Sequence, residues 1–398
     1  MGIDSENKRR SAQRLIRGPR TMPRPDGGAD EYDRRHRTAY RGPLVALAVI
    51  ASLAPAGVTI LCLIGDQNGR VLARLRPNVQ RASWRFNAVG QMAFALARTD
   101  EKLQEEYLRF GNRVLLQFDN GLPPWGGIIG SPYEWNEAEV LFQAYSGEEL
   151  LYRRRTARQR RFDNATVGAI ALALLAEADA VYPTGVRPGA IWGGGSGHFP
   201  EYHYKSLGDA LRDSLVENLS AESFDVTARE EAGYIVFELN LYGARGEQKP
   251  NVALVENQNV SDVRFRVEDN IVNAWYMAGE GSDWGEDDRV YAEAADEESI
   301  RRYGRREDFE ARSGVIFQST LDETIAKRLD ETAAPSRVLG LAVTDDRPGR
   351  FGEYDVGDAV MCVLPSYDWQ GIRGLYRVLG REFIPANGVT DLVLEEVR

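Results

Sequence analysis

A few side chains in the sequence have residue types that could bind a metal. His198, Glu201 and His203 combine two imidazoles and a carboxylate, which are ligand types that Zn²⁺ accepts. They fall in an irregular glycine-rich stretch without the i, i+4 spacing that places two histidines on one helix face. The chain holds three histidines in all, so imidazole acid–base chemistry has little material. We therefore expect no metal site.

Paired carboxylates are the second candidate for chemistry. Asp287 with Asp288, and Glu297 with Glu298, could supply the two carboxyl groups of a glycosidase. Neighbouring carboxylates in a polar run more often form a solvated loop. The run Gly193-Gly194-Gly195-Ser196-Gly197 lacks the Lys-Ser/Thr of a phosphate-binding loop. These patterns predict a protein that is not an enzyme and binds no cofactor.

The two cysteines also argue against covalent chemistry. Cys62 and Cys362 stand in apolar runs in distant halves of the chain, and neither has a histidine nearby in sequence. Free cysteines in such surroundings behave as small core side chains. We expect both to be reduced and buried.

Two stretches share a pattern that indicates a repeated β unit. Residues 111–146 alternate apolar and polar residues on both sides of a Pro-Pro-Trp-Gly-Gly turn, and residues 357–378 form a shorter echo. A period of two bounded by Gly and Pro is typical of half-buried strands. The first stretch reads Gly111-x-x-Val114 then Trp125-x-Gly127-Ile128, and the second reads Gly357-x-x-Val360 then Trp369-x-Gly371-Ile372. Two chance Trp-Gly turns are the plainer explanation, but we favour one β unit used twice.

Strand and helix signals divide the rest of the chain into domains. Residues 58–160 hold five or six short strand patterns between Gly, Pro and Asn turns, which predict a small β-barrel domain. Residues 161–250 hold two helical and two strand patterns, which predict an α+β domain. Its second helix should begin at Ser206, with Asp209 at capping-box spacing.

Residues 251–398 return to strand patterns and predict a second β-barrel domain. It is interrupted at about 280–335 by an insertion, in which Thr320 and Glu323 have capping-box spacing and Leu321, Ile325 and Leu329 form a helical stripe. The expected fold class is therefore α+β, mainly β. It has two similar small β-barrel domains, an α+β module between them and a helical insertion in the second barrel.

The amino-terminal region predicts a disordered basic tail followed by an apolar segment. Residues 1–43 carry eleven Lys/Arg against six Asp/Glu, a charge of +5. Because the whole chain has a net charge of −11, residues 44–398 have a net charge of −16. Residues 42–65 then run without a charge, and Ala54-Pro55-Ala56 imitates a signal-peptide cleavage site. The preceding basic region is far longer than in a signal peptide, and Pro43 and Pro55 bracket too few residues to span a bilayer. We expect residues 1–57 to be a disordered tail whose short apolar segment packs on the first β domain, without stable membrane association.

An arginine-rich boundary follows the first β domain. The acidic body argues against a broad nucleic-acid-binding face, which needs clustered Lys and Arg. A solvated hinge is the interpretation we favour for the boundary, and a positive ring facing a polyanion or an acidic neighbour is the alternative. Its arginines are Arg153, Arg154, Arg155, Arg158, Arg160 and Arg161.

The order of these pieces resembles the hub proteins of phage tail tips and baseplates, especially the siphophage minor tail or tail-associated hub family. The resemblance covers residues 58–398 and rests on the two Gly-x-x-Val units, the arginine-rich boundary, residues 299–307 and Tyr376-Arg377-Val378 through Leu392-Val393-Leu394. Residues 1–57 depart from the family. The resemblance implies a homotrimer in which two similar β domains per chain match a sixfold tail ring. Trp125, Gly127, Trp369, Gly371 and the six arginines are then structural or interface candidates.

Such a hub would be a structural protein of the virion tail, assembled in the host cytoplasm. The resemblance implies a distal tail ring protein, a tape-measure protein and tip or fibre proteins as partners, with DNA passing only transiently through a central channel. An alternative is a secreted β-rich carbohydrate-active enzyme, which rests on the signal-like residues 44–56, the seven Trp and seventeen Tyr, and the acidic loops. A membrane-anchored assembly protein held by residues 44–64 is a third hypothesis.

Overall fold

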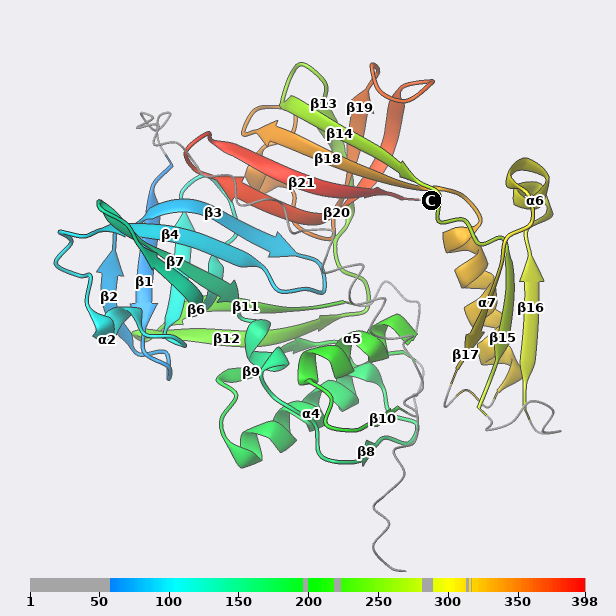
Figure 1. The fold of residues 1–398 in the computed structure, drawn as a ribbon, viewed down its shortest axis with the longest axis horizontal. Coiled ribbons are helices and arrows are strands. Elements are labelled where there is room, and N and C mark those ends of the chain that lie inside the picture. Colours follow the sequence, from blue (N-terminus) through cyan, green and yellow to red (C-terminus); the bar gives the residue numbers. More distant parts are fainter. Residues whose placement is uncertain are drawn as a thin grey trace, which may run out of the picture. The chain divides into compact units, whose positions relative to one another are not determined.

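The computed structural model describes residues 58–195, 200–217, 223–280, 289–312, 315 and 317–397. The tail and apolar segment expected in residues 1–57, and the candidates His198, Asp287 and Asp288, lie outside these residues. The described chain is mainly β with a smaller helical content, which confirms the expected fold class (Figure 1). None of the helices in the described ranges has the length and apolar character to cross a membrane.

The first β unit comprises seven strands and one short helix. They are β1 (Ile60–Gly65), β2 (Val71–Leu75), β3 (Asn78–Arg85), β4 (Gln91–Ala97), α2 (Glu105–Leu108), β5 (Arg113–Phe118), β6 (Trp125–Trp135) and β7 (Glu139–Ser146). The strands hydrogen-bond in the order β3-β4-β7-β6-β5-β1-β2. Their alternating apolar side chains form a core that includes Phe94, Trp125 and Phe142.

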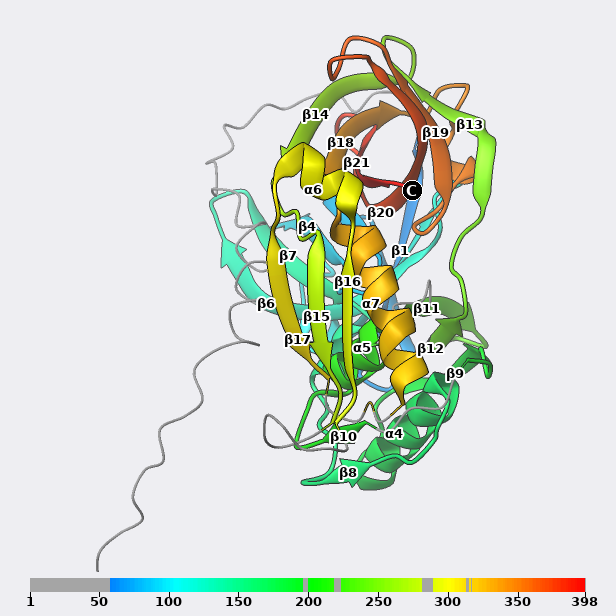
Figure 2. The same ribbon diagram turned by 90° about the vertical axis from the view of Figure 1, so that its right-hand side faces the viewer.

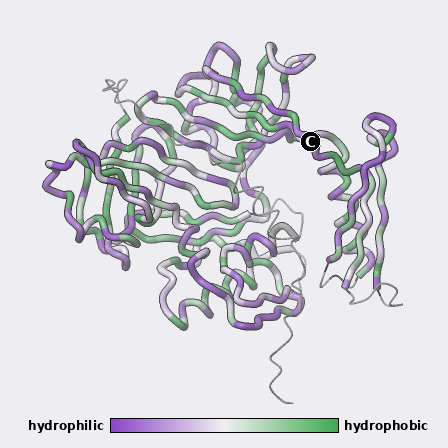
Figure 3. The backbone as a smooth tube through the Cα atoms, viewed as in Figure 1, coloured by the Kyte–Doolittle hydropathy of each residue, from purple (hydrophilic) through white to green (hydrophobic). Residues whose placement is uncertain are grey.

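The second β unit comprises six strands and a 3₁₀ turn. They are β13 (Gln248–Val255), β14 (Val260–Glu268), β18 (Ser336–Thr344), η1 (Phe351–Glu353), β19 (Ala359–Leu364), β20 (Ile372–Ile384) and β21 (Val389–Glu396). The strand order is β14-β18-β21-β20-β19-β13. Figure 3 shows hydrophobic and hydrophilic residues interspersed along these strands, as expected for strands with one face in a core.

Both units connect their strands in the same way. The first to fifth strands are β3, β4, β5, β6 and β7 in one unit, and β14, β18, β19, β20 and β21 in the other. In both units the first strand pairs with the second, the second with the fifth, the fifth with the fourth and the fourth with the third, always antiparallel. The units differ beyond the third strand, where β1 pairs with β5 antiparallel but β13 pairs with β19 parallel. The shared five-strand path supports one β unit used twice.

A glycine bulge opens the third strand of each unit. Gly111 N–H donates to the carbonyl of Ile129 at 2.8 Å, and Ile129 N–H donates to Asn112 O at 2.8 Å. Gly357 and Val378 repeat the arrangement, with both bonds again 2.8 Å. The two glycines have φ of 87° and 101°, a backbone conformation that residues other than glycine rarely adopt. The Gly-x-x-Val pattern therefore marks equivalent positions.

The predicted equivalence of Trp125 and Trp369 is wrong. Trp125 opens β6 and pairs with Leu116, five residues after Gly111. The residue five after Gly357 is Cys362, which pairs with Gly374. The counterpart of Trp125 is thus Gly374, and Trp369 lies in the loop before β20. The two hairpin loops differ in length, so matching letters across them does not match strand positions.

The α+β module lies between the two units in the chain. Its elements are α3 (Glu149–Tyr152), β8 (Arg160–Arg161), α4 (Val167–Val181), β9 (Val186–Ile191), β10 (Glu201–Tyr202), α5 (Leu207–Glu217), β11 (Ser223–Glu231) and β12 (Tyr234–Tyr242). The helix expected to begin at Ser206 is confirmed, because Ser206 Oγ accepts the backbone N–H of Asp209 at 3.0 Å. Apolar residues of α4, α5, β11 and β12 share one core, which Leu115 and Ile128 of the first unit join.

The insertion is a separate small sheet covered by a helix. Its elements are β15 (Ala274–Ala278), β16 (Tyr291–Ala295), α6 (Glu297–Tyr303), β17 (Glu307–Ala311) and α7 (Gln318–Thr332). Figure 2 shows α7 lying along this sheet, where Leu321 and Ile325 are buried against Trp275. The insertion thus begins soon after β14 ends at Glu268, earlier than the expected residue 280.

The capping box expected at Thr320 is wrong. Helix α7 starts at Gln318 with Phe317 as its N-cap, and Leu321 N–H donates to Phe317 O at 3.3 Å. Thr320 therefore lies inside the first turn, where its side chain is not in the capping position. The helix itself and its apolar stripe are as expected.

Candidate assembly interface

The two β units are joined through the edges of their sheets. The second half of β20 pairs antiparallel with β3, with Arg381 opposite Trp84, Glu382 opposite Ser83 and Phe383 opposite Ala82. Phe86 N–H also donates to Leu379 O at 2.9 Å. Strand β19 pairs with residues 372–377 of β20, and β3 pairs with residues 380–383 along the same edge of β20.

Charged side chains flank this junction on one face. Glu382 of β20 lies 3.6 Å from Arg85 and 4.0 Å from Arg81, both on β3. The two arginines stand on either side of Ser83, which is directly opposite Glu382. Because side chains two apart on a strand share a face, this carboxylate meets both cations.

A buried arginine occupies the other face of the junction. Arg381 is 0% exposed, and its guanidinium donates to the carbonyls of Tyr354 at 2.9 Å and Phe351 at 3.0 Å. It also lies 5.7 Å from the centroid of the Trp84 ring and 3.5 Å from Asp355. Sequence reasoning missed Arg381, since an arginine in an alternating strand is ordinarily assigned to the solvent face.

The sequence candidates Trp125 and Gly127 lie inside the first unit. Trp125 is 1% exposed, and its Nε1–H donates to Ser83 O of β3 at 2.9 Å. A Cβ on Gly127 would lie 2.2 Å from Tyr145 O and 2.6 Å from the Trp125 ring. Both residues therefore build the core rather than a surface.

Trp369 and Gly371 lie together in the β19–β20 loop. Trp369 is 99% exposed, and Gly371 has a φ of 76° that the tight turn requires. The structure therefore does not bring the two predicted Trp-Gly pairs into equivalent places. A fully exposed tryptophan at a hairpin tip remains a candidate contact for another protein.

The arginine-rich boundary is partly internal scaffold. Arg154 donates to the carbonyls of Tyr182 and Ala178 at the end of α4, at 2.6 and 2.7 Å. Arg160 pairs with Glu177 at 2.7 Å. Each of these two side chains thus anchors the boundary to α4.

The other four arginines of the boundary are exposed. Arg153 and Arg161 each pair with a neighbouring carboxylate at 3.0 Å. Arg155 and Arg158 make no side-chain hydrogen bond or ion pair to another described residue. These two are therefore the available cations of the boundary.

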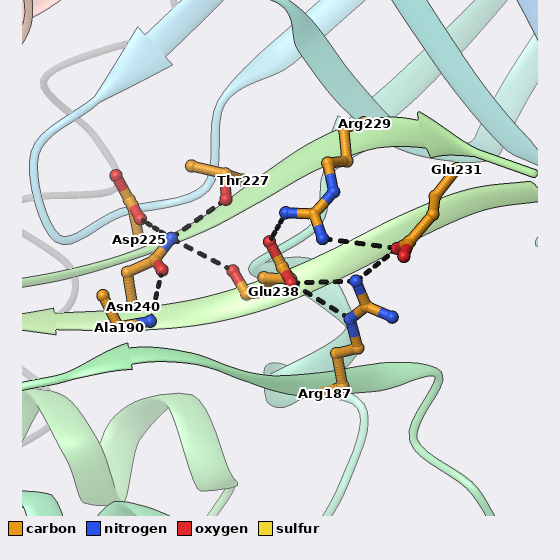
Figure 4. Close-up of polar contacts among 8 residues, drawn as sticks. All are labelled: Arg187, Ala190, Asp225, Thr227, Arg229, Glu231, Glu238 and Asn240. Atoms are coloured by element: carbon orange, nitrogen blue, oxygen red, sulfur yellow. Dashed lines mark hydrogen bonds and ion pairs between the residues drawn. The ribbon is translucent and has the colours of Figure 1, made fainter.

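One face of the β11-β12-β9 sheet carries a ladder of polar side chains (Figure 4). Arg187 on β9 and Arg229 on β11 both bind Glu238 on β12 and Glu231. The hydrogen bond from Arg187 holds the pKa of Glu231 below its usual range. The ladder neutralises its own charges, so it fixes the three strands without presenting a net charge to a partner.

A buried carboxyl connects the first β unit with the α+β module. Glu148 accepts the backbone N–H of Val226 at 2.9 Å and the Ser146 hydroxyl at 2.5 Å. Ser146 Oγ in turn accepts Gly90 N–H at 2.7 Å. Burial raises the pKa of Glu148 above its ordinary value of 4.5, although both hydrogen bonds lower it.

Removing this titration should change how stability depends on pH. A carboxyl with a raised pKa in the folded protein contributes stability that is fully present below pH 4.5 and is lost as the pH rises through the folded pKa. In the wild type this contribution to the free energy of unfolding should fall as the pH rises. Glu148→Gln cannot ionise at this position, so its free energy of unfolding should rise relative to that of the wild type as the pH increases. Urea unfolding between pH 4 and 8 measures this, with exposed Glu137→Gln as control. Parallel curves for Glu148→Gln and wild type would contradict it.

The described residues offer no group of three or more His, Cys, Asp and Glu that could hold a metal. His203 lies 3.3 Å from Glu201. Cys62 and Cys362 are free and buried, as expected, and burial raises the pKa of each thiol to about 12. Glu297 and Glu298 stand in the first turn of α6, where carboxylates stabilise the helix dipole.

Comparison with known proteins shows what this architecture is. No family model and no curated protein matches the sequence. A 43 kDa tail protein of prophage MuSo2 from Shewanella oneidensis matches with a TM-score of 0.57 and 13% identity, over 85% of this chain and 98% of that one. This chain has the fold of phage tail proteins.

Two further tail proteins support the same fold. A tail protein of Neisseria meningitidis MC58 matches with a TM-score of 0.57 and 16% identity, over 86% of this chain and 97% of that one. Prophage tail protein gp18 of Listeria monocytogenes EGD-e matches with a TM-score of 0.54 and 13% identity, over 84% and 94%. The tail-protein fold confirms the resemblance drawn from motif order, at the level of fold.

Proposed function

We propose that this chain is the structural hub of a phage or phage-like tail tip or baseplate. Three copies form a ring around a central channel, and the two β units of each copy give six similar units. The observation that carries this proposal is the shared five-strand path of the two units, joined through β20 and β3. A threefold ring with six similar units can contact a sixfold tail tube.

The proposed hub is an adaptor and needs no active site. Its partners are a distal tail ring protein, the tape-measure protein and tip or fibre proteins, with DNA passing only transiently through the channel. Its place is the virion tail, after assembly in the host cytoplasm. The tail-protein fold supports this assignment over a secreted carbohydrate-active enzyme. That alternative rested on the signal-like residues 44–56, the seven Trp and seventeen Tyr, and the acidic loops. Of these, residues 44–56 and the pair Asp287 and Asp288 lie outside the described residues.

Electron microscopy of the purified chain tests the ring. Class averages should show threefold particles with an open centre and six similar lobes around it. A field of single-chain particles at micromolar concentration would contradict the proposal. The same averages would also separate a ring from an open filament, which head-to-tail contacts form when they do not close.

The exposed arginines give a second test of the hub. We propose that Arg155 and Arg158 face an acidic neighbour or the channel contents. Reversing both to Glu should weaken co-sedimentation with tail tubes by about tenfold or more, because like charges across an interface repel. Arg301→Glu with Arg302→Glu, on α6, is the matched reversal elsewhere. Unchanged co-sedimentation would return the boundary to the solvated-hinge interpretation.

A further inference from the structure

The second half of β6 is an open, exposed sheet edge. Within the described residues, β5 pairs with β6 only from Trp125 to Ile128, and no strand takes the same edge beyond Ile129. Residues 131–137 are all exposed, including Tyr133 at 48% and Trp135 at 59%. Long exposed edges with aromatic side chains are templates for pairing with another chain.

The equivalent half of β20 is covered. Ile129 and Val378 make the same bulge hydrogen bonds, so they occupy equivalent positions. Ile129 lies opposite Ala144 of β7 and Val378 lies opposite Leu394 of β21, so positions on β7 and β21 can be matched by counting from these two residues. Glu134 lies opposite Leu141, and Glu382 lies opposite the equivalent Asp391. Glu134 therefore corresponds to Glu382 and Trp135 to Phe383. In the second unit these positions lie against β3, and Phe383 is 0% exposed.

The strand equivalent to β3 is β14, which is also open on one edge. Strand β14 pairs with β18, and no strand of the described chain pairs along its other edge. Ala93 of β4 and Gly340 of β18 are equivalent, because they pair with matching positions of β7 and β21. Arg81 lies opposite Ala93 and Arg264 lies opposite Gly340, so Arg81 corresponds to Arg264. In the same register Ala82 corresponds to Phe265 and Ser83 to Arg266.

We propose that the second half of β6 pairs antiparallel with β14 of a second copy of this chain. The pairing repeats between copies the junction that β20 and β3 make within one copy. The inference rests on the proposed hub and names the strand edges that join its subunits. Each copy carries one edge of each kind, so the contact is head-to-tail and closes into a ring when the rotation allows.

Side-chain chemistry on the two edges is complementary in this register. Glu134 falls opposite Arg266 and diagonal to Arg264, as Glu382 falls opposite Ser83 and diagonal to Arg81. Both β14 arginines are exposed, at 79% and 66% of the side chain. Each already pairs with a carboxylate of its own strand, Arg264 with Asp262 at 3.3 Å and Arg266 with Glu268. In the proposed contact Glu134 would join these exposed pairs.

Apolar residues gather on the opposite face of the same register. Trp135 falls opposite Phe265, and Val267, two residues along the same face of β14, is 51% exposed. Closing the two edges would bury these side chains as the internal junction buries Phe383. Burial of exposed aromatic and aliphatic area is the favourable term that makes such a contact persist.

Charge reversal tests the proposed contact. Glu134→Arg or Arg266→Glu alone should raise the dissociation constant of the assembled protein by about tenfold or more, and the double reversal should recover most of the loss. Glu137→Arg, an exposed change beyond the end of β6, is the matched control. Single variants that assemble like the wild type would overturn the pairing.

A disulfide separates the contact from assembly itself. Directly opposed residues of antiparallel strands have Cα atoms about 4.5–5.5 Å apart, within disulfide reach. Oxidised Glu134→Cys with Arg266→Cys should run as covalent multimers on non-reducing gels, and Glu137→Cys with Arg266→Cys should not. A trimer that does not cross-link would overturn the β6–β14 contact and leave the hub intact. A stable monomer would overturn both.

Discussion

Replacing Trp125 with alanine is expected to lower the free energy of unfolding by about 3–5 kcal/mol, the usual cost of truncating a buried aromatic residue. Trp125 is fully enclosed in the core of the first β unit, and its indole binds the Ser83 carbonyl of β3. The substitution removes the packing and leaves that carbonyl without its donor. Urea denaturation of the purified chain measures the effect.

Two further variants separate the causes. Trp125→Phe keeps most of the ring and loses the hydrogen bond, so it should cost about 1–2 kcal/mol. Trp369→Ala, at the exposed tip of the β19–β20 loop, should change stability by less than about 0.5 kcal/mol. Equal effects at the two tryptophans would contradict the finding that only Trp125 belongs to a core.

Arg381→Ala is expected to cost about 3–5 kcal/mol, as breaking a buried charged network usually does. Its guanidinium binds two carbonyls before β19 and stacks beside Trp84 of the other unit. The substitution leaves a cavity and two buried acceptors without their donor at the place where the β units meet. Thermal and urea unfolding report the loss.

The same strand supplies the control for Arg381. Arg373 lies on β20 before the junction and is exposed, so Arg373→Ala should stay within about 0.5 kcal/mol of the wild type. Hydrogen exchange gives a second readout, because amides of β3 and of residues 379–384 should exchange faster in Arg381→Ala. Unchanged protection at these amides would contradict a role for Arg381 in holding the units together.

Local sequence signals predicted the elements well where one physical cause dominates. The Ser206 cap, the apolar stripe on α7 and the glycines at 111 and 357 each depend on residues a few positions apart. A glycine with positive φ or a hydroxyl at a helix start carries its meaning locally. The fold class followed from these signals and from the order in which they occur.

Features that depend on tertiary pairing were not visible in the sequence. Strand register decides that Gly374, and not Trp369, is the counterpart of Trp125. The burial of Arg381 depends on β3, some 300 residues away in the chain. The open edges of β6 and β14 become recognisable only when the two units are compared strand by strand. Single-sequence patterns specify faces and turns, whereas edges are specified by which strands meet.

Native mass spectrometry of the purified chain tests the central claim most directly. The account predicts a species of three times the 44.4 kDa chain mass, which persists on dilution and is weakened by Glu134→Arg. A single species at 44.4 kDa across the micromolar range would contradict the hub and the edge pairing together.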